Sequence, residues 1–238
     1  MRRANAGFSL VELTVSLAVV ILVSGVILRV VSVVGARSAT EQTKLDMFQE
    51  TREFMDQMSR DLRQAGYPSP RNLDPSVFTQ NPFINDHVAA AGVVRVDSGD
   101  LWFEGDMDGT GQVSVVRYHL DTSTDNGCPC LKRSQVPKVD GSPLTGQSDP
   151  VYQIEVQGVL NTSIFSAFTN GAAKTLPLDI STDSGVTIAG VDTLQATLTL
   201  RAATIDPETR KRPVTTLVTT VRLNNCSQAA IGSKTSCQ

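Results

Sequence analysis

The sequence predicts an α+β protein: one long N-terminal helix packed on an antiparallel β-sheet domain. Three observations predict this class. Residues 1–67 contain no proline and carry helix-type apolar patterns. Beyond Pro68, β-branched and aromatic residues recur in short runs separated by Gly, Asp, Asn and Pro. No helical pattern is evident between these runs, which favours strands joined by hairpins rather than parallel β-α-β units.

The first half of the predicted helix is apolar on all sides. Between Phe8 and Leu28 the only formal charge is Glu12, and Arg2 and Arg3 precede the run. About twenty helical residues span roughly 30 Å, the hydrocarbon thickness of a bilayer. A carboxylate inside such a segment is costly unless it has a partner. The sequence therefore predicts a single membrane-spanning segment with an unusual acidic residue near its start.

The second half of the predicted helix is amphipathic. Gly66 stands where a helix C-terminus favours glycine, and Pro68 prevents continuation. We therefore expect one helix from about Phe8 to Ala65, with its later part packed on a folded domain. The apolar stripe that predicts this packing recurs at three- and four-residue steps and consists of Leu45, Phe48, Met55, Met58 or Ser59, Leu62 and Ala65.

The stretch Gly7-Phe8-Ser9-Leu10-Val11-Glu12-Leu13 resembles the N-terminal signal of the type IV pilin superfamily. In that family a short basic leader ends in Gly, Phe follows, and the fifth mature residue is Glu. The resemblance implies that a prepilin peptidase cleaves between Gly7 and Phe8 and that the new amine of Phe8 is N-methylated. It also implies that Glu12 is an assembly contact, paired with the Phe8 amine of an adjacent subunit.

This resemblance divides the chain into four parts: a leader (residues 1–7), a transmembrane and filament-core helix (8–36), an amphipathic second half of the helix (37–66) and a periplasmic antiparallel β domain (67–238). Two alternatives compete. One is a secretory signal peptide cleaved after Val34-Gly35-Ala36. The other is a plain anchor oriented by Arg2 and Arg3. Neither alternative requires Glu12, and both make it costly.

The segment after Pro68 alternates in the manner of β-strands. Residues 101–104 and 113–120 flank a Gly- and Asp-rich turn and predict a hairpin, and residues 206–213 connect two later strands in the same way. The segment 68–86 reads as an irregular connection. The predicted strands lie within residues 88–96, 101–104, 113–120, 151–159, 191–200 and 214–223.

Asp61-Leu62-Arg63-Gln64-Ala65-Gly66-Tyr67, followed by the acidic hairpin and the late strands, resembles the PilW/GspJ group of minor pilins and pseudopilins. This resemblance implies a minor type IV pilin incorporated into a pilus or priming its assembly. The alternatives are a minor pseudopilin of type II secretion and an anchored binding or adhesin domain outside any filament. The implied partners are the prepilin peptidase, other pilins or pseudopilins, the inner-membrane assembly platform and, before assembly, membrane lipid.

The loop Asp106-Met107-Asp108-Gly109-Thr110-Gly111 resembles the first half of an EF-hand loop, with Asp106 and Asp108 as the Ca²⁺ ligands. The twelfth position is Arg117, where an EF-hand requires Glu. The alternative is a turn in which Asp and Gly satisfy local backbone geometry. No other cofactor is expected.

The cysteines Cys128, Cys130, Cys226 and Cys237 would lie in the periplasm, where disulfides persist. We predict a Cys226–Cys237 disulfide. Cys128 and Cys130 are expected to be either joined in a strained bridge or free, because a spacing of two residues is too tight for an unstrained disulfide. The spacing does not favour a zinc site.

Catalytic and nucleic-acid-binding functions are not indicated. His87 and His119 are the only histidines, and the sequence holds no Walker loop, no G-x-G-x-x-G and no H-E-x-x-H motif. The formal charge is −3, and removal of Arg2 and Arg3 leaves 19 basic against 24 acidic residues, or −5. We therefore predict that the chain is not an enzyme. The run Arg210-Lys211-Arg212 is read as a solvated turn rather than a contact with nucleic acid.

Overall fold

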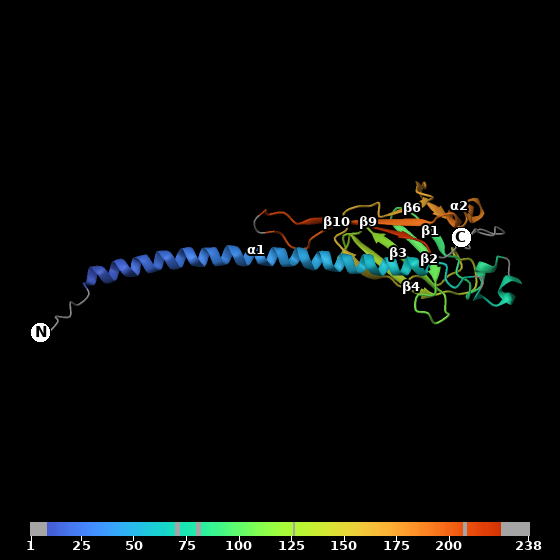
Figure 1. The fold of residues 1–238 in the computed structure, drawn as a ribbon, viewed down its shortest axis with the longest axis horizontal. Helices are drawn as coiled ribbons and strands as arrows, with labels where there is room; N and C mark the ends of the chain where they lie inside the picture. The colour runs from blue at the N-terminus through green and yellow to red at the C-terminus, as the bar shows by residue number, and fades with distance from the viewer. Residues whose placement is uncertain (1–8, 70–71, 80–81, 126, 207–208, 225–238) are drawn as a thin grey trace. The chain divides into compact units, whose positions relative to one another are not determined.

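The computed structural model describes residues 9–69, 72–79, 82–125, 127–206 and 209–224. It confirms the α+β class: a helix, α1 (Leu10–Gln64), is followed by two antiparallel sheets (Figure 1). The chain divides into two compact units, residues 1–46 with 204–213, and residues 47–203 with 214–238.

In the first unit, α1 is exposed along its apolar part. Its hydroxyl groups are satisfied within the helix: Thr14 Oγ1 donates to the Val11 carbonyl at 2.9 Å, and Ser16 Oγ donates to the Glu12 carbonyl at 2.8 Å. Within the segment 204–213, the Asp206 N–H donates to the Lys211 carbonyl at 2.9 Å. The basic run 210–212 of this segment is exposed, as expected.

In the second unit, α1 ends where the sequence predicts. Gly66 adopts a φ of 80°, a conformation that glycine favours after a helix, and its N–H donates to the Glu104 carbonyl at 2.8 Å. Gly105 lies so close to the helix end that a Cβ there would stand 2.5 Å from the Gln64 carbonyl oxygen. This close approach fixes the end of α1 against the second strand of the larger sheet.

The larger sheet has six antiparallel strands in the order β5-β4-β3-β2-β1-β8. The β2–β3 hairpin is the one predicted around the acidic turn, with Asp100 opposite His119 and Gly105 opposite Ser114. The strands are β1 (Val93–Val96), β2 (Asp100–Gly105), β3 (Ser114–Asp121), β4 (Cys130–Pro137), β5 (Gln153–Gln157) and β8 (Leu178–Asp179).

The smaller sheet has the order β10-β9-β6-β7, and its long β9–β10 hairpin was also predicted. Its strands are β6 (Phe165–Thr169), β7 (Ala172–Ala173), β9 (Thr193–Arg201) and β10 (Val214–Arg222). The short helical segments are η2 (Pro75–Thr79), η3 (Phe83–Asn85), η4 (Thr182–Gly185) and α2 (Val186–Ala189).

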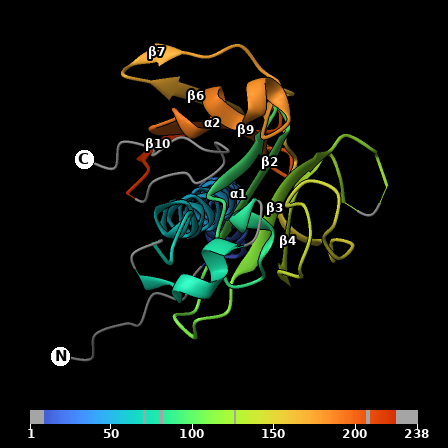
Figure 2. The ribbon, with the colours of Figure 1, turned by 90° about the vertical axis from the view of Figure 1, so that its right-hand side faces the viewer.

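The core lies between the C-terminal part of α1 and the inner faces of both sheets (Figure 2). The predicted stripe is confirmed at Met55, Met58, Leu62 and Ala65, which are all buried. It is wrong at Leu45 and Phe48, which are 55% and 45% exposed, because at this part of the helix Met47 packs against the core and Thr51 is buried instead. Phe54, which the stripe omitted, is buried and packs edge-on against Tyr118.

The expected first strand within residues 88–96 is confirmed as β1. Two other expectations need correction. Strands β4, β6, β7 and β8 fall in segments for which no strand is predicted. A one-turn helix, α2, also lies between strands. The sheets are nevertheless antiparallel throughout, because every described strand pair is antiparallel.

Candidate functional site

The N-terminal processing residues Gly7 and Phe8 lie outside the described residues, so cleavage and methylation stay predictions. Glu12 lies in the first turn of α1, and its side chain is exposed. Among the described residues, no cation or hydrogen-bond donor contacts its carboxylate. An acidic side chain on an otherwise apolar helix is costly in an apolar environment unless it has a partner, and none of the described residues supplies one to Glu12.

Among the described residues, none covers the apolar surface of the helix that carries Glu12. Leu10, Leu22 and Leu28 are 77%, 71% and 69% exposed. Helix α1 is the one described helix that is long and apolar enough to cross a membrane, a test that a signal sequence also passes. Such a surface is stable in lipid or against other apolar helices, but not in water.

A buried polar network attaches the C-terminal part of α1 to the larger sheet. Asp61 projects from the helix, is 3% exposed, and accepts hydrogen bonds at 2.9 Å from both Tyr118 Oη and Arg133 Nε. A second nitrogen of Arg133 lies 2.8 Å from the same carboxylate oxygen. Burial, together with the negative charge of Asp61, raises the pKa of Tyr118 well above its ordinary value, so the phenol stays a donor.

A second buried ion pair supports the strand on which the helix ends. Glu104 and Lys138 have fully buried side chains, and Lys138 Nζ donates to Glu104 Oε2 at 2.6 Å. Lys138 Nζ also donates to the carbonyls of Ile84 and Ala89, which fills its three donor positions. Burial raises the pKa of Glu104 and lowers that of Lys138.

Sequence reasoning missed both networks. Glu104 was visible as an acid in the apolar strand 101–104, and Asp61 lies on the same face of α1 as Met58 and Leu62. A charged residue on a predicted core face was the available signal. Their partners, Lys138 and Arg133, come from segments that had no predicted strand. The sequence therefore could not predict which residues form the two ion pairs.

The acidic β2–β3 loop is organised by its own backbone. Asp106 is 3% exposed, and its carboxylate accepts backbone hydrogen bonds from Gly109, Thr110 and Gly111 at 2.8, 3.2 and 2.8 Å. Asp108 accepts a hydrogen bond from Thr110 Oγ1 at 2.7 Å, which lowers the pKa of Asp108. These hydrogen bonds are the ones expected if the loop is a turn in which Asp and Gly satisfy the local backbone geometry. The assignment of Asp106 and Asp108 as Ca²⁺ ligands stays a prediction.

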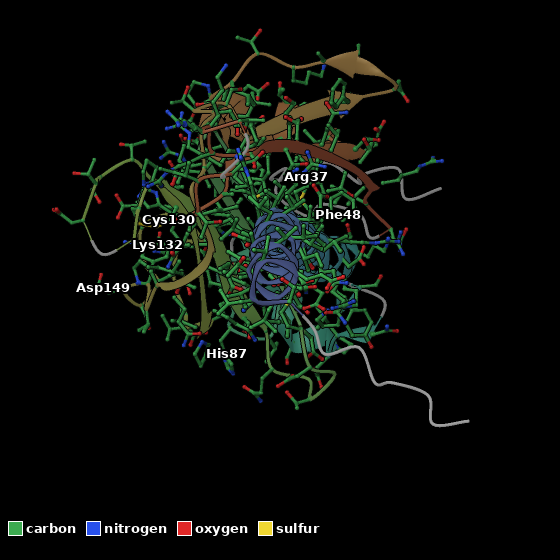
Figure 3. The ribbon with its side chains drawn as sticks, turned by 90° about the vertical axis from the view of Figure 1, so that its left-hand side faces the viewer. Arg37, Phe48, His87, Cys130, Lys132 and Asp149 are labelled. Carbon is green, nitrogen blue, oxygen red and sulfur yellow. A yellow bond between two sulfur atoms is a disulfide. The ribbon has the colours of Figure 1, made fainter. Side chains whose placement is uncertain are left out.

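Cys128 and Cys130 form a disulfide with each other, which excludes the free-thiol alternative. Cys130 begins β4, and the Cα atoms of the two cysteines lie 4.3 Å apart, so the two sulfur atoms can meet. The nearby Asp121 carboxylate is bound to Lys132 Nζ at 2.5 Å (Figure 3 labels Cys130 and Lys132). Cys226 and Cys237 lie outside the described residues, and their pairing stays a prediction.

The two histidines are bound to carboxylates. His119 Nδ1 lies 2.5 Å from Asp100 across the β2–β3 ladder, and His87 Nδ1 lies 2.9 Å from Asp140. The hydrogen bond with Asp100 raises the pKa of His119. These contacts account for both side chains as parts of structural ion pairs.

Comparison with solved structures shows a likeness in fold. The chain is similar to a type IV-like pilin from Thermus thermophilus, with a TM-score of 0.45 and 14% sequence identity over 76% of this chain and 99% of that one. No family model and no curated protein sequence matches the chain. A likeness at this TM-score assigns no function, so the residues of the chain itself carry the functional inference.

Proposed function

We propose that the chain is a pilin-type filament subunit, made as a precursor and held in the inner membrane by α1 with its β domain in the periplasm. The observation that carries the proposal is the combination of Gly7-Phe8 with Glu12, which has no partner among the described residues, on an exposed apolar helix. In a filament this helix leaves lipid and packs on neighbouring subunit helices, where close packing supplies the stabilisation.

The finer assignment is a minor pilin of the PilW-like group that enters a type IV pilus or primes its assembly. The match at residues 61–67 supports it, and in this chain that stretch is where α1 joins the β domain through Asp61 and Gly66. The subunit acts through assembly and not through catalysis. Its partners are the prepilin peptidase, other pilins and the assembly platform.

The test is the N-terminus of the mature protein. We expect mass spectrometry of membrane-extracted protein to find a chain that begins at Phe8 and carries one additional methyl group on its amine. Gly7→Ala should be partly processed, whereas Gly7→Leu should remain uncut, because a residue without a Cβ lets the scissile bond enter a narrow site.

The other possible N-termini identify the alternatives. An intact Met1 in cells with an active prepilin peptidase would contradict the proposal and indicate a plain anchor. A chain that begins after Ala36 would indicate a secretory signal peptide.

A further inference from the structure

A row of cationic and aromatic side chains crosses the face of the larger sheet that points away from α1. Arg95 on β1 pairs in register with Trp102 on β2, and Trp102 pairs with Arg117 on β3. The guanidinium carbons lie 5.7 Å (Arg95) and 4.4 Å (Arg117) from the Trp102 ring centroid. Both distances are within the range of cation–π interactions. The register of three strands therefore builds an Arg–Trp–Arg row.

The segment 138–152 runs beside this row and is attached to it. The Val151 N–H donates to Ser134 Oγ at 2.9 Å, and Ser134 is the residue of β4 that pairs with Arg117. Leu144 packs in the small apolar cluster that includes Trp102. Asp149, in the same segment, lies on the outer side of the sheet (Figure 3).

Polar hydrogens in this row lack acceptors. Three nitrogen atoms, Arg95 Nε, Trp102 Nε1 and Arg117 Nε, are buried without a hydrogen-bond partner. They are three of only five such side-chain atoms among the described residues, and they belong to three consecutive members of one row. Buried donors without acceptors are rare because each loses its hydration without compensation. Their concentration here indicates an acceptor that the chain does not itself supply.

Of the two arginines in the row, Arg117 has fewer ion-pair partners among the described residues. It is 7% exposed, and among the described residues its guanidinium makes one hydrogen bond, a long one of 3.5 Å to the Ser148 carbonyl. Arg95 has Asp97 at 3.5 Å, but no carboxylate of the described residues lies within ion-pair distance of Arg117. Burial lowers the pKa of Arg117, and the nearby Asp149 and Tyr152 only partly offset this. A guanidinium remains charged in proteins, so Arg117 is a buried cation whose nearest described carboxylates lie beyond ion-pair distance.

We propose that Arg117, stacked on Trp102 beside segment 138–152, binds an oxyanion, the carboxylate or phosphate group of a ligand, through the free donors of its guanidinium. The planar donor fork of arginine matches both groups, and stacking on Trp102 holds the fork in one plane. This binding site goes beyond the proposed filament function and does not depend on it.

Trp102 is the only tryptophan in the chain, so its fluorescence reports on this site alone. The full-length protein in detergent micelles is titrated with sodium phosphate, and separately with sodium acetate, against sodium chloride at equal ionic strength. We expect a saturable change in Trp102 emission with phosphate, acetate or both, beyond any change with chloride. The anion that saturates identifies a phosphate or a carboxylate ligand.

Variants test whether Arg117 is responsible. Arg117→Gln should weaken the response roughly tenfold or more, as expected for the loss of a charge-assisted hydrogen bond. Arg117→Lys, which keeps the charge and loses the fork, should also weaken it. Arg222→Gln, which alters an exposed arginine on β10, is the matched control and should respond like the wild type.

Two results would overturn the proposal. One is a wild-type response that does not saturate or equals that of chloride. The other is a response that appears only in Asp149→Asn, which would show that Asp149 already serves Arg117 in solution. If Arg117→Gln does not fold, the melting temperature of the wild type in the three salts tests whether an anion binds. A bound anion raises it, and equal values in phosphate, acetate and chloride would contradict the site.

Discussion

At the residue scale, the buried Asp61 carboxylate and the backbone carbonyl of Glu104 hold the end of α1. Asp61 reaches from the helix to Tyr118 and Arg133 on the sheet, and Glu104 sits on the strand whose carbonyl accepts the Gly66 N–H. Neither acid contacts solvent appreciably. These contacts explain why the helix end is fixed in the β domain.

Removal of the Asp61 carboxylate should therefore be strongly destabilising. Asp61→Ala leaves Tyr118 Oη and Arg133 buried without their acceptor, and we expect a loss of about 3 kcal/mol in the free energy of unfolding. Denaturant unfolding of the purified protein measures it. Asp56→Ala, at an exposed position of the same helix, should change the free energy by less than about 0.5 kcal/mol. Equal effects of the two substitutions would refute this role of Asp61.

His119 should make stability depend on pH. The hydrogen bond with Asp100, with help from the charge of Asp121 and against that of Lys132, raises its pKa above 6.5 in the folded protein. A raised histidine pKa gives stability that is complete below the unfolded value and is lost as pH rises through the folded value. We expect the free energy of unfolding to fall as pH rises above 6.5 and through the raised pKa of His119. His119→Gln and Asp100→Asn should both flatten this fall; a slope unchanged in both variants would contradict the assignment.

At the element scale, the sequence predicts those elements whose periodicity is uninterrupted. Helix α1 is recovered almost to the residue because residues 8–65 have no proline and end at Gly66. The β2–β3 and β9–β10 hairpins are recovered because their turns contain Gly, Asp or Pro between β-branched runs. Both faces of β9 show the regular alternation of a half-buried strand.

The strand β4 was missed because its inward-facing residues include a charge. Arg133 points toward the helix to bind Asp61, whereas Lys132 and Ser134 face the other side, so the polar pattern shows no alternation. The candidate residues at the N-terminus could be named from sequence alone, since the motif is local. The Arg–Trp–Arg row could not, because its members come together only through the register of three strands.

The acidic β2–β3 loop provides the prediction at this scale. Asp106→Asn replaces one acceptor oxygen with a donor that would face a backbone N–H, so we expect a loss of about 1–3 kcal/mol in stability. Thermal unfolding in Ca²⁺ and in EDTA measures it. The loss should appear in both solutions, because the three backbone hydrogen bonds need no metal.

The same experiment tests the Ca²⁺ hypothesis. If Asp106 and Asp108 bind Ca²⁺, the wild type melts higher in Ca²⁺ than in EDTA and Asp108→Asn removes that difference. An Asp106→Asn protein as stable as the wild type would show that the carboxylate does not organise the loop.

At the scale of the whole molecule, the chain combines a folded β domain with a helix whose apolar part is exposed among the described residues. The C-terminal part of α1 is buried by both sheets, while the apolar part is exposed and carries Glu12. A filament resolves both features at once, because neighbouring helices cover the apolar surface and the Phe8 amine of an adjacent subunit meets the carboxylate. A plain membrane anchor covers the apolar surface with lipid, but it leaves the Glu12 carboxylate in the membrane without a partner.

The most direct measurement is therefore the amount of a Glu12→Ala protein in sheared filaments, relative to the amount in membranes of the same cells. We predict normal insertion and normal cleavage before Phe8 but loss from the filament fraction, because the partner amine would be left unpaired in an apolar core. Glu50→Ala, at an exposed glutamate later in the same helix, should reach filaments like the wild type. Wild-type levels of Glu12→Ala in filaments, or no wild-type protein in any filament fraction, would contradict the account.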